Sequence, residues 1–236
     1  MFTIQRAESR FVVEHDWIYS ARSFSFGDDY DPDNTSFGAL RVLNDDRIAG
    51  GRGFGAHPHR EMEIVTIVLS GQLEHEDSTG HKAVTGFGGI QRMSAGTGII
   101  HSEMNPGESE TELLQLWFTP DRQGLTPSYE TSSYDPSLLK GSLLPIVSGR
   151  DELNGKPGVA GIHQDLTIYL SALEDGQSLV YCGSAGRRLF LFVLGGSLKV
   201  NEEHHLGRRD AARISDTEEL RIAAGPAATF MLIDLP

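Results

Sequence analysis

A short apolar run in the first half of the chain limits the folds that are open to it. Residues 64–69 (IVTIVL) are all apolar or β-branched, and Ser70 and Gly71 follow at once. A run of this length that ends at a turn signal is typical of a buried β-strand. Similar runs lie at residues 113–118 and 167–170, and helical periodicity is weak throughout. We therefore predict an all-β protein built as a sandwich or barrel.

The strand pattern breaks once, near the middle of the chain. Pro120, Pro127 and Pro136 flank a segment rich in Ser and Thr, a composition typical of surface connections. The 236 residues are enough for two domains. We predict an N-terminal domain over residues 1–125, a linker over 126–142 and a C-terminal domain over 143–236.

An internal repeat supports two copies of one fold. A shift of 125 residues places residues 64–73 on residues 189–198, and the apolar run, a glycine and the following leucine coincide. In this register His57 falls on Cys182, and His101 falls near Pro226. We therefore expect the second copy to keep the fold without metal ligands. Cys182 is expected to be a small buried apolar residue that metal binding does not need.

Composition excludes several classes of function. The chain has 33 acidic and 20 basic residues and a net charge of −13, which argues against a nucleic-acid partner. Its single cysteine excludes an internal disulfide and suits a reducing compartment. The first residues lack the apolar core of a signal peptide, and no apolar run approaches a membrane span. We expect a cytoplasmic monomer that binds no membrane.

Two short motifs carry candidate metal ligands. His57-Pro58-His59 precedes the apolar run, and His101-Ser102-Glu103 follows it at a distance. Residues two apart in a strand share a face, so each motif can present two ligands to one side. If the motifs face each other, four N and O atoms converge and can hold a divalent first-row metal with a position left open. The lack of thiolates disfavours a closed structural zinc site.

Other acidic and histidine residues near these motifs are weaker candidates for metal ligands. Glu63 would lie about 13 Å from His59 in a straight strand at ~3.3 Å per residue, unless a turn at residues 60–61 brings it back. If Glu63 is not a ligand, we expect its carboxylate to accept a hydrogen bond from a ligand histidine and so to orient that ring. His75 and His81 are expected at the surface, on the strand and turn that follow.

Longer segments now support a family resemblance. Gly51-x5-His57-x-His59-x3-Glu63 and Gly98-x2-His101-x3-Asn105 resemble the two cupin motifs. FSFGDDYDP (24–32), RVLNDDRI (41–48), HPHREMEIVTIVLSGQLEHEDSTG (57–80), GIIHSEMNP (98–106) and QLWFTP (115–120) resemble the pirin family, in its bacterial quercetin 2,3-dioxygenase-like branch. The resemblance is strong over roughly residues 10–130 and diffuse beyond.

The resemblance implies two tandem cupin domains (double-stranded β-helix, or jelly-roll), of which only the N-terminal one binds metal. Glu63 occupies the usual cupin ligand position, but the pirin pattern places the carboxylate ligand at Glu103. The expected ligand set is therefore His57, His59, His101 and Glu103. The family most often carries iron, so we expect one Fe(II) ion, although Zn, Mn, Co, Ni or Cu would also suit these ligands.

The same resemblance implies a reaction. A flavonol such as quercetin would be cleaved by O2 with release of CO, and Glu103 would accept the proton of the 3-hydroxyl as general base. The alternative is a non-enzymatic, pirin-like regulatory or redox-sensing protein that binds metal. A third reading is an unrelated cupin isomerase or a protein that binds a small aromatic molecule.

Overall fold

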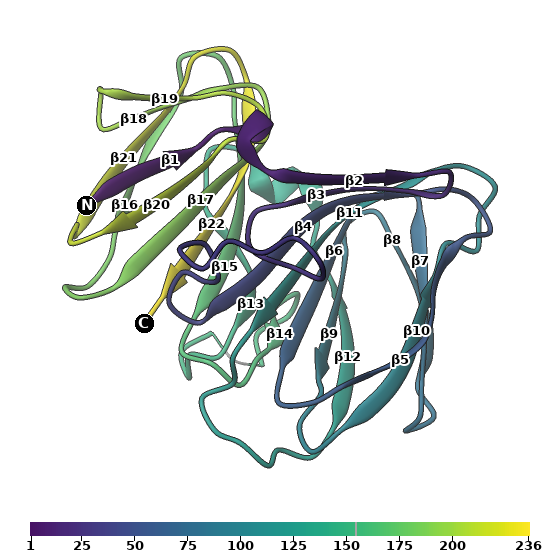
Figure 1. Cartoon of the computed structure of the whole chain (residues 1–236). Helices are drawn as coiled ribbons and strands as arrows, with labels where there is room; N and C mark the ends of the chain where they lie inside the picture. Colours follow the sequence, from purple (N-terminus) through teal and green to yellow (C-terminus); the bar gives the residue numbers. More distant parts are fainter. Residues whose placement is uncertain (154) are drawn as a thin grey trace. The chain divides into compact units, whose positions relative to one another are not determined.

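The computed structural model describes residues 1–153 and 155–236 and shows an all-β protein (Figure 1). These residues form strands and two short 3-10 helices, η1 (Ala7–Ser9) and η2 (Pro136–Leu139), with no α-helix among them. The chain divides into two compact units. The first unit holds residues 11–134 and 155–164, and the second unit holds residues 1–10, 135–153 and 165–236. The predicted all-β class is confirmed.

The first unit contains two antiparallel sheets. The larger has the order β12-β9-β6-β11-β4-β3-β2: β12 (Ser128–Ser133), β9 (Gly89–Ser94), β6 (Glu63–Ser70), β11 (Thr111–Phe118), β4 (Leu40–Ile48), β3 (Ile18–Arg22) and β2 (Phe11–His15). The smaller has the order β5-β10-β7-β8: β5 (Gly53–His59), β10 (Ile99–Met104), β7 (Gln72–Asp77) and β8 (Lys82–Gly86). The short strand β14 (Ala160–Gly161) also belongs to this unit.

The second unit repeats this arrangement. One sheet contains β1 (Phe2–Gln5), β20 (Ala211–Ser215), β17 (Arg188–Gly195), β22 (Ala228–Leu235), β15 (Thr167–Leu173) and β13 (Leu144–Ser148), in that order. The other has the order β16-β21-β18-β19: β16 (Ser178–Cys182), β21 (Glu219–Ala224), β18 (Leu198–Val200) and β19 (His204–Leu206). β6 and β17 hold corresponding positions and begin at residues 63 and 188, so the predicted 125-residue register relates equivalent strands.

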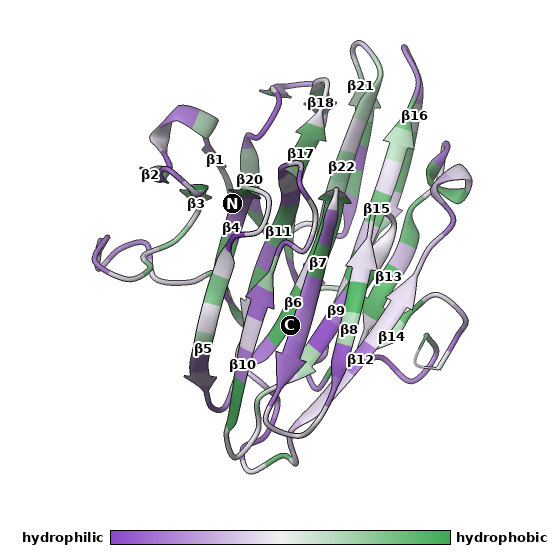
Figure 2. Cartoon of the chain, turned by 90° about the vertical axis from the view of Figure 1, so that its right-hand side faces the viewer, coloured by the Kyte–Doolittle hydropathy of each residue, from purple (hydrophilic) through white to green (hydrophobic). Residues whose placement is uncertain are grey.

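The interior of the first unit is layered, and its middle layer is polar. Pairing places Asn44 opposite Gln115, Gln115 opposite Thr66, and Thr66 opposite Gln91. Facing residues of paired strands point to the same side of a sheet, so these side chains form one polar row across four strands. Two apolar clusters flank this row along the strands: Ile48, Val68, Leu73 and Leu113 on one side, and Ile64, Met93, Ala95 and Ile99 on the other. The colours of Figure 2 show hydrophilic and hydrophobic residues interspersed along the strands.

The interior of the second unit has a different content. It contains a large cluster of buried apolar side chains drawn from strands of both sheets, among them Leu191, Val193, Ile222, Phe230 and Leu232. The strand order is therefore shared by the two units, and the polar layer is a property of the first.

Three details differ from the sequence-based expectations. Residues 128–133, expected within a linker, form β12 because they pair with β9 along their whole length. Residues 1–10 group with the second unit because β1 pairs with β20. Cys182 is exposed rather than buried, and it pairs with Glu219 where His57 pairs with His101; Glu219, not Pro226, therefore takes the place of His101. No helix in the described residues is long and apolar enough to cross a membrane.

The close approach of β5 to β10 yields a test of the fold. A Cβ atom added at Gly53 would lie 2.1 Å from the carbonyl oxygen of Glu103, whereas one added at Gly55 would meet nothing within 4 Å. We expect Gly53→Ala to lower the free energy of unfolding by about 1–3 kcal/mol, a typical cost of overpacking. Gly55→Ala, in the same strand, is the matched control and should unfold like the wild type in a thermal melt. Equal melting temperatures for both variants would contradict the close approach.

Candidate metal centre

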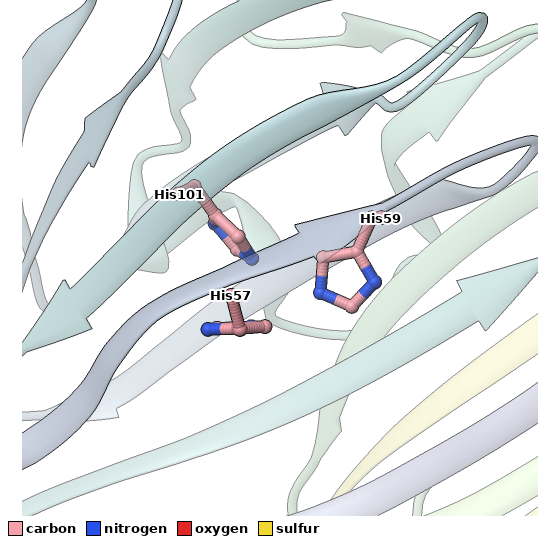
Figure 3. Close-up of side chains that lie close together, drawn as sticks. All are labelled: His57, His59 and His101. Carbon is pink, nitrogen blue, oxygen red and sulfur yellow. The ribbon is translucent and has the colours of Figure 1, made fainter.

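Three of the predicted ligands meet on neighbouring strands of the smaller sheet. His57 and His59 lie on β5, and His101 lies on β10 directly opposite His57. One ring nitrogen from each histidine can be chosen so that all three lie within 4.8 Å of one another. The ring centroids are 4.5 Å apart for His57 and His101, and 4.8 Å apart for His57 and His59. Figure 3 shows the three rings gathered at one place.

The hydrogen bonds of these rings leave nitrogen atoms free for a metal. Nδ1 of His57 lies 2.7 Å from the carbonyl oxygen of Gly55, so Nδ1 carries the proton and Nε2 keeps its lone pair. Nε2 of His101 is buried and has no hydrogen-bond partner. A buried, unpaired imidazole nitrogen is costly unless another group binds it. The residues therefore fit a divalent metal ion.

The protonation state of the rings also suits metal binding. Burial, together with the neighbouring His57 ring, lowers the pKa of His59 to about 4 and that of His101 to about 3. Both rings are neutral at pH 7 as a result, and only a neutral imidazole can ligate a metal.

A hydrogen-bonded chain behind His101 sets its tautomer. Nδ1 of His101 lies 3.3 Å from Nδ1 of His75, and Nε2 of His75 lies 2.9 Å from the carboxylate of Asp77. Asp77 can only accept when ionised, so His75 donates to it from Nε2 and accepts from His101 at Nδ1. His101 thus carries its proton on Nδ1, and Nε2 is left as the metal-binding atom.

The surroundings of His75 keep this chain in place. The ring stacks on Tyr129 with centroids 3.9 Å apart. Burial alone would raise the pKa of Asp77, but hydrogen bonds from Thr79 and His75 lower it to about 2, so the carboxylate stays ionised. The prediction that His75 lies at the surface is wrong, since only 1% of it is exposed. The sequence held one signal for this buried position: His75 lies two residues after the apolar Leu73, so the two side chains share a face of the strand. Leu73, His75 and Asp77 are all buried in the structure.

The fourth predicted ligand, Glu103, is buried beside this group but lies outside it. Its carboxylate accepts a hydrogen bond of 2.7 Å from Nε2 of Gln115 and a longer one, 3.5 Å, from the hydroxyl of Thr66. Gln115 is held in turn by Trp117, whose ring N–H donates to the amide oxygen. Burial raises the pKa of Glu103. Glu103 therefore connects the smaller sheet to the polar row of the larger one.

The alternative carboxylate, Glu63, faces away from the histidines. Ile64 belongs to the inner cluster, so the adjacent Glu63 points to the other side of β6. Its carboxylate accepts hydrogen bonds from the Ser94 hydroxyl and the backbone N–H of His163. The expectation that Glu63 orients a ligand histidine is therefore wrong. It instead joins β6 to β9 and to the segment around residue 163.

A cavity opens next to the histidines, inside the first unit. It contains about 560 Å³ of empty space, part of which is open to solvent. Its aromatic walls are Phe26, Phe54 and Trp117. The remaining lining residues are Ile18, Ser20, Arg22, Asn44, Asp46, His57, His59, Glu103 and Gln115. A ligand in this cavity would lie against both the histidines and Glu103.

The chain behind His101 can be tested through metal affinity. His75→Ala removes the acceptor that fixes the His101 tautomer, and loss of such an outer partner typically weakens metal binding about 10–100-fold. Calorimetric titration with Ni(II) measures the effect. His81→Ala is the matched control, since its half-exposed ring lies 3.6 Å from the same Asp77 carboxylate but is not part of the chain to His101. Unchanged affinity in His75→Ala would exclude a positioning role for His75.

Comparisons with known proteins match both halves of the chain. Residues 4–118 match the Pirin family model, and residues 146–235 match that of the quercetinase C-terminal cupin domain. A protein of Escherichia coli (strain K12) named quercetin 2,3-dioxygenase is 38% identical over 237 residues, which covers 100% of this chain and 99% of that protein. A pirin-like protein of Caulobacter vibrioides is 36% identical over 94% of each chain.

A solved structure gives the same result for the fold. The crystal structure of the bacterial pirin YhhW from Escherichia coli in complex with nickel(II) matches with a TM-score of 0.92 at 37% identity, covering 100% of this chain and 99% of that one. Both halves of the chain, the cupin architecture and the histidine triad thus lead to one conclusion: the protein belongs to the pirin family.

Proposed function

We propose that this protein is a metal-dependent dioxygenase that cleaves flavonols such as quercetin and releases CO. The observation that carries the proposal is the convergence of His57, His59 and His101 at a cavity with aromatic walls and a buried carboxylate. The relative named quercetin 2,3-dioxygenase, which is similar over its full length, supports the same substrate class.

We assign the metal to the three histidines, with Glu103 as a fourth ligand. Fe(II) is the proposed ion, and the nickel(II) complex of the related YhhW supports a divalent first-row metal in general. When bound, the ion would supply Lewis-acid activation of the substrate and a site for O2 chemistry.

We also propose that the protein is cytoplasmic. Its one cysteine, Cys182, is exposed and forms no disulfide, which suits a reducing compartment.

Glu103 is the proposed general base. Its buried position raises its pKa, which makes the ionised carboxylate a stronger proton acceptor. Gln115 and Thr66 donate to its two oxygens and hold it at the cavity wall. A flavonol presents an acidic 3-hydroxyl next to a carbonyl, and this hydroxyl can give up its proton to Glu103.

The aromatic walls suit a planar substrate. Trp117 contacts the His59 ring edge-to-face, with centroids 4.7 Å apart, and Phe26 contacts Trp117 in the same way at 5.2 Å. All three rings line the cavity, where they would limit the access of water to the reacting group. A flat, fused-ring substrate can lie along them while its 3-hydroxyl and carbonyl point toward the histidines.

The ligand set gives a prediction about metal content. Purified protein should hold about one divalent ion per chain, and His57→Ala or His101→Ala should remove most of it. Glu103→Gln should retain a reduced amount through the three histidines. Glu63→Gln is the matched control, because Glu63 faces the other side of its sheet, and it should keep the wild-type content. Elemental analysis measures all four; a loss in Glu63→Gln equal to that in Glu103→Gln would refute the choice of carboxylate.

The reaction gives a second prediction. Metal-loaded protein should consume O2 with quercetin and leave the matching flavone, which lacks the 3-hydroxyl, unreacted. A site built around one buried polar contact can discriminate about 10⁴-fold against the analogue without it. Glu103→Gln should lose most turnover, since a glutamine amide cannot accept the proton.

Oxygen uptake and CO release measure this reaction directly. Full activity in Glu103→Gln with metal retained would eliminate the general base. If the metal-loaded wild type is inactive toward flavonol and flavone alike, the enzymatic proposal falls and the non-enzymatic, metal-binding regulatory alternative takes its place.

A further inference from the structure

The wall of the cavity formed by β3 and β4 carries polar groups that the mechanism above does not use. Asn44 and Asp46 are two residues apart on β4 and share a face, and Arg22 and Ser20 are their partners on β3. All four side chains line the cavity that also contains His57, His59 and Glu103.

Ser20, Asn44 and Asp46 are buried and Arg22 is partly buried, yet several of their atoms have no partner. Asn44 is 4% exposed and Asp46 is 2% exposed. The side-chain oxygen of Asn44, the Oδ1 atom of Asp46 and the Nε atom of Arg22 all lack a hydrogen-bond partner. Buried polar atoms are nearly always paired in folded proteins, so three unpaired atoms on one cavity wall indicate a site that a ligand completes.

The other contacts of these residues fix which atoms remain available. One terminal nitrogen of Arg22, Nη1, donates to the carboxylate of Asp29 and to the carbonyl of Phe26, which leaves the Nε–H free to donate. Ser20 hydrogen-bonds Asp46. Burial raises the pKa of Asp46 to about 7, in agreement with a carboxyl that lacks a strong cationic partner. The wall therefore offers two acceptor oxygens and one donor.

We infer that Asn44, Asp46 and Arg22 form a hydroxyl-binding platform that selects aromatic substrates with adjacent phenolic hydroxyl groups. Two phenolic O–H groups can donate to the Asn44 and Asp46 oxygens, and the Arg22 Nε–H can donate back to a phenolic oxygen. The aromatic walls hold the ring, while the histidines and Glu103 receive the opposite, chelating end of the molecule. This inference rests on the proposed function and specifies which flavonols the site prefers.

The test compares two flavonols that differ only at the ring expected to meet the platform. Both carry the 3-hydroxyl; quercetin has adjacent hydroxyls on its pendant ring, and the analogue has none there. Anaerobic absorbance titration of metal-loaded protein gives a Kd for each without turnover. The wild type should bind quercetin at least roughly 10-fold more tightly, as expected for buried acceptors that are left unpaired by the analogue.

Variants then assign the preference to these residues. Asn44→Leu and Asp46→Leu should each reduce the ratio of the two Kd values by most of its wild-type size, mainly by weakening quercetin binding. Because damage to folding affects both ligands alike, the ratio isolates the hydroxyl contacts. Asn44→Ala and Asp46→Ala serve if leucine is not accommodated. Val12→Ala is the control, because Val12 is exposed on the neighbouring strand β2 and lies outside the cavity lining, and it should keep the wild-type ratio and metal content.

The outcomes separate this inference from the proposed activity. A wild-type ratio near one, or a ratio unchanged in the Asn44 and Asp46 variants, overturns the platform whether or not flavonols are cleaved. A clear preference that the variants abolish supports it. If that preference is found but neither flavonol consumes O2 in air, the dioxygenase proposal fails and the platform stands as a binding site.

Discussion

The antiparallel pairing of β5 with β10 is the interaction on which the site depends. It places His57 opposite His101, and His59 shares their face two residues away. Because side chains alternate along a strand, a slip of one residue would turn the histidines of one strand away from the other. The strands approach closely at Gly53, and a register shift between His101 and Glu103 adjusts the pairing just after the last histidine. The convergence of the three histidines thus follows from backbone hydrogen bonds formed between segments far apart in the sequence.

The polar interior of the first unit is stable because most of its groups bind one another. Glu103 is held by Gln115, Gln115 by Trp117, and Gln91 by Thr85 and the carbonyl of Leu73. Buried polar groups left unpaired would destabilise the fold, so such networks are tolerated when they are satisfied. Three of the buried polar atoms that stay unpaired, on Asn44, Asp46 and Arg22, belong to residues that line one cavity. Exceptions to good pairing are expected where a protein binds its ligands.

The two units show that the strand order and the site are separate properties. β6 and β17 occupy equivalent central positions, and each is flanked by strands in the same order. The first unit contains a polar row and a histidine triad, whereas an apolar cluster fills the second. The strand order is therefore kept without the histidine triad, and the residues that could carry chemistry are inward-facing side chains of one copy.

The sequence by itself determined the central strands, which follow from continuous apolar runs, and the repeat, which follows from the match of these runs 125 residues apart. It also determined that His57 and His59 share a face, because side chains alternate along a strand. It did not determine which way Glu63 points: the turn before it, where Glu61 has a φ of 50°, resets the alternation at the start of β6. Nor did it show that the Ser- and Thr-rich β12 joins a sheet, since its partner β9 supplies the pairing. His75 likewise gained its role only through contact with His101. Local periodicity decides which residues share a face; what that face meets is decided by long-range strand pairing, which only the tertiary structure shows.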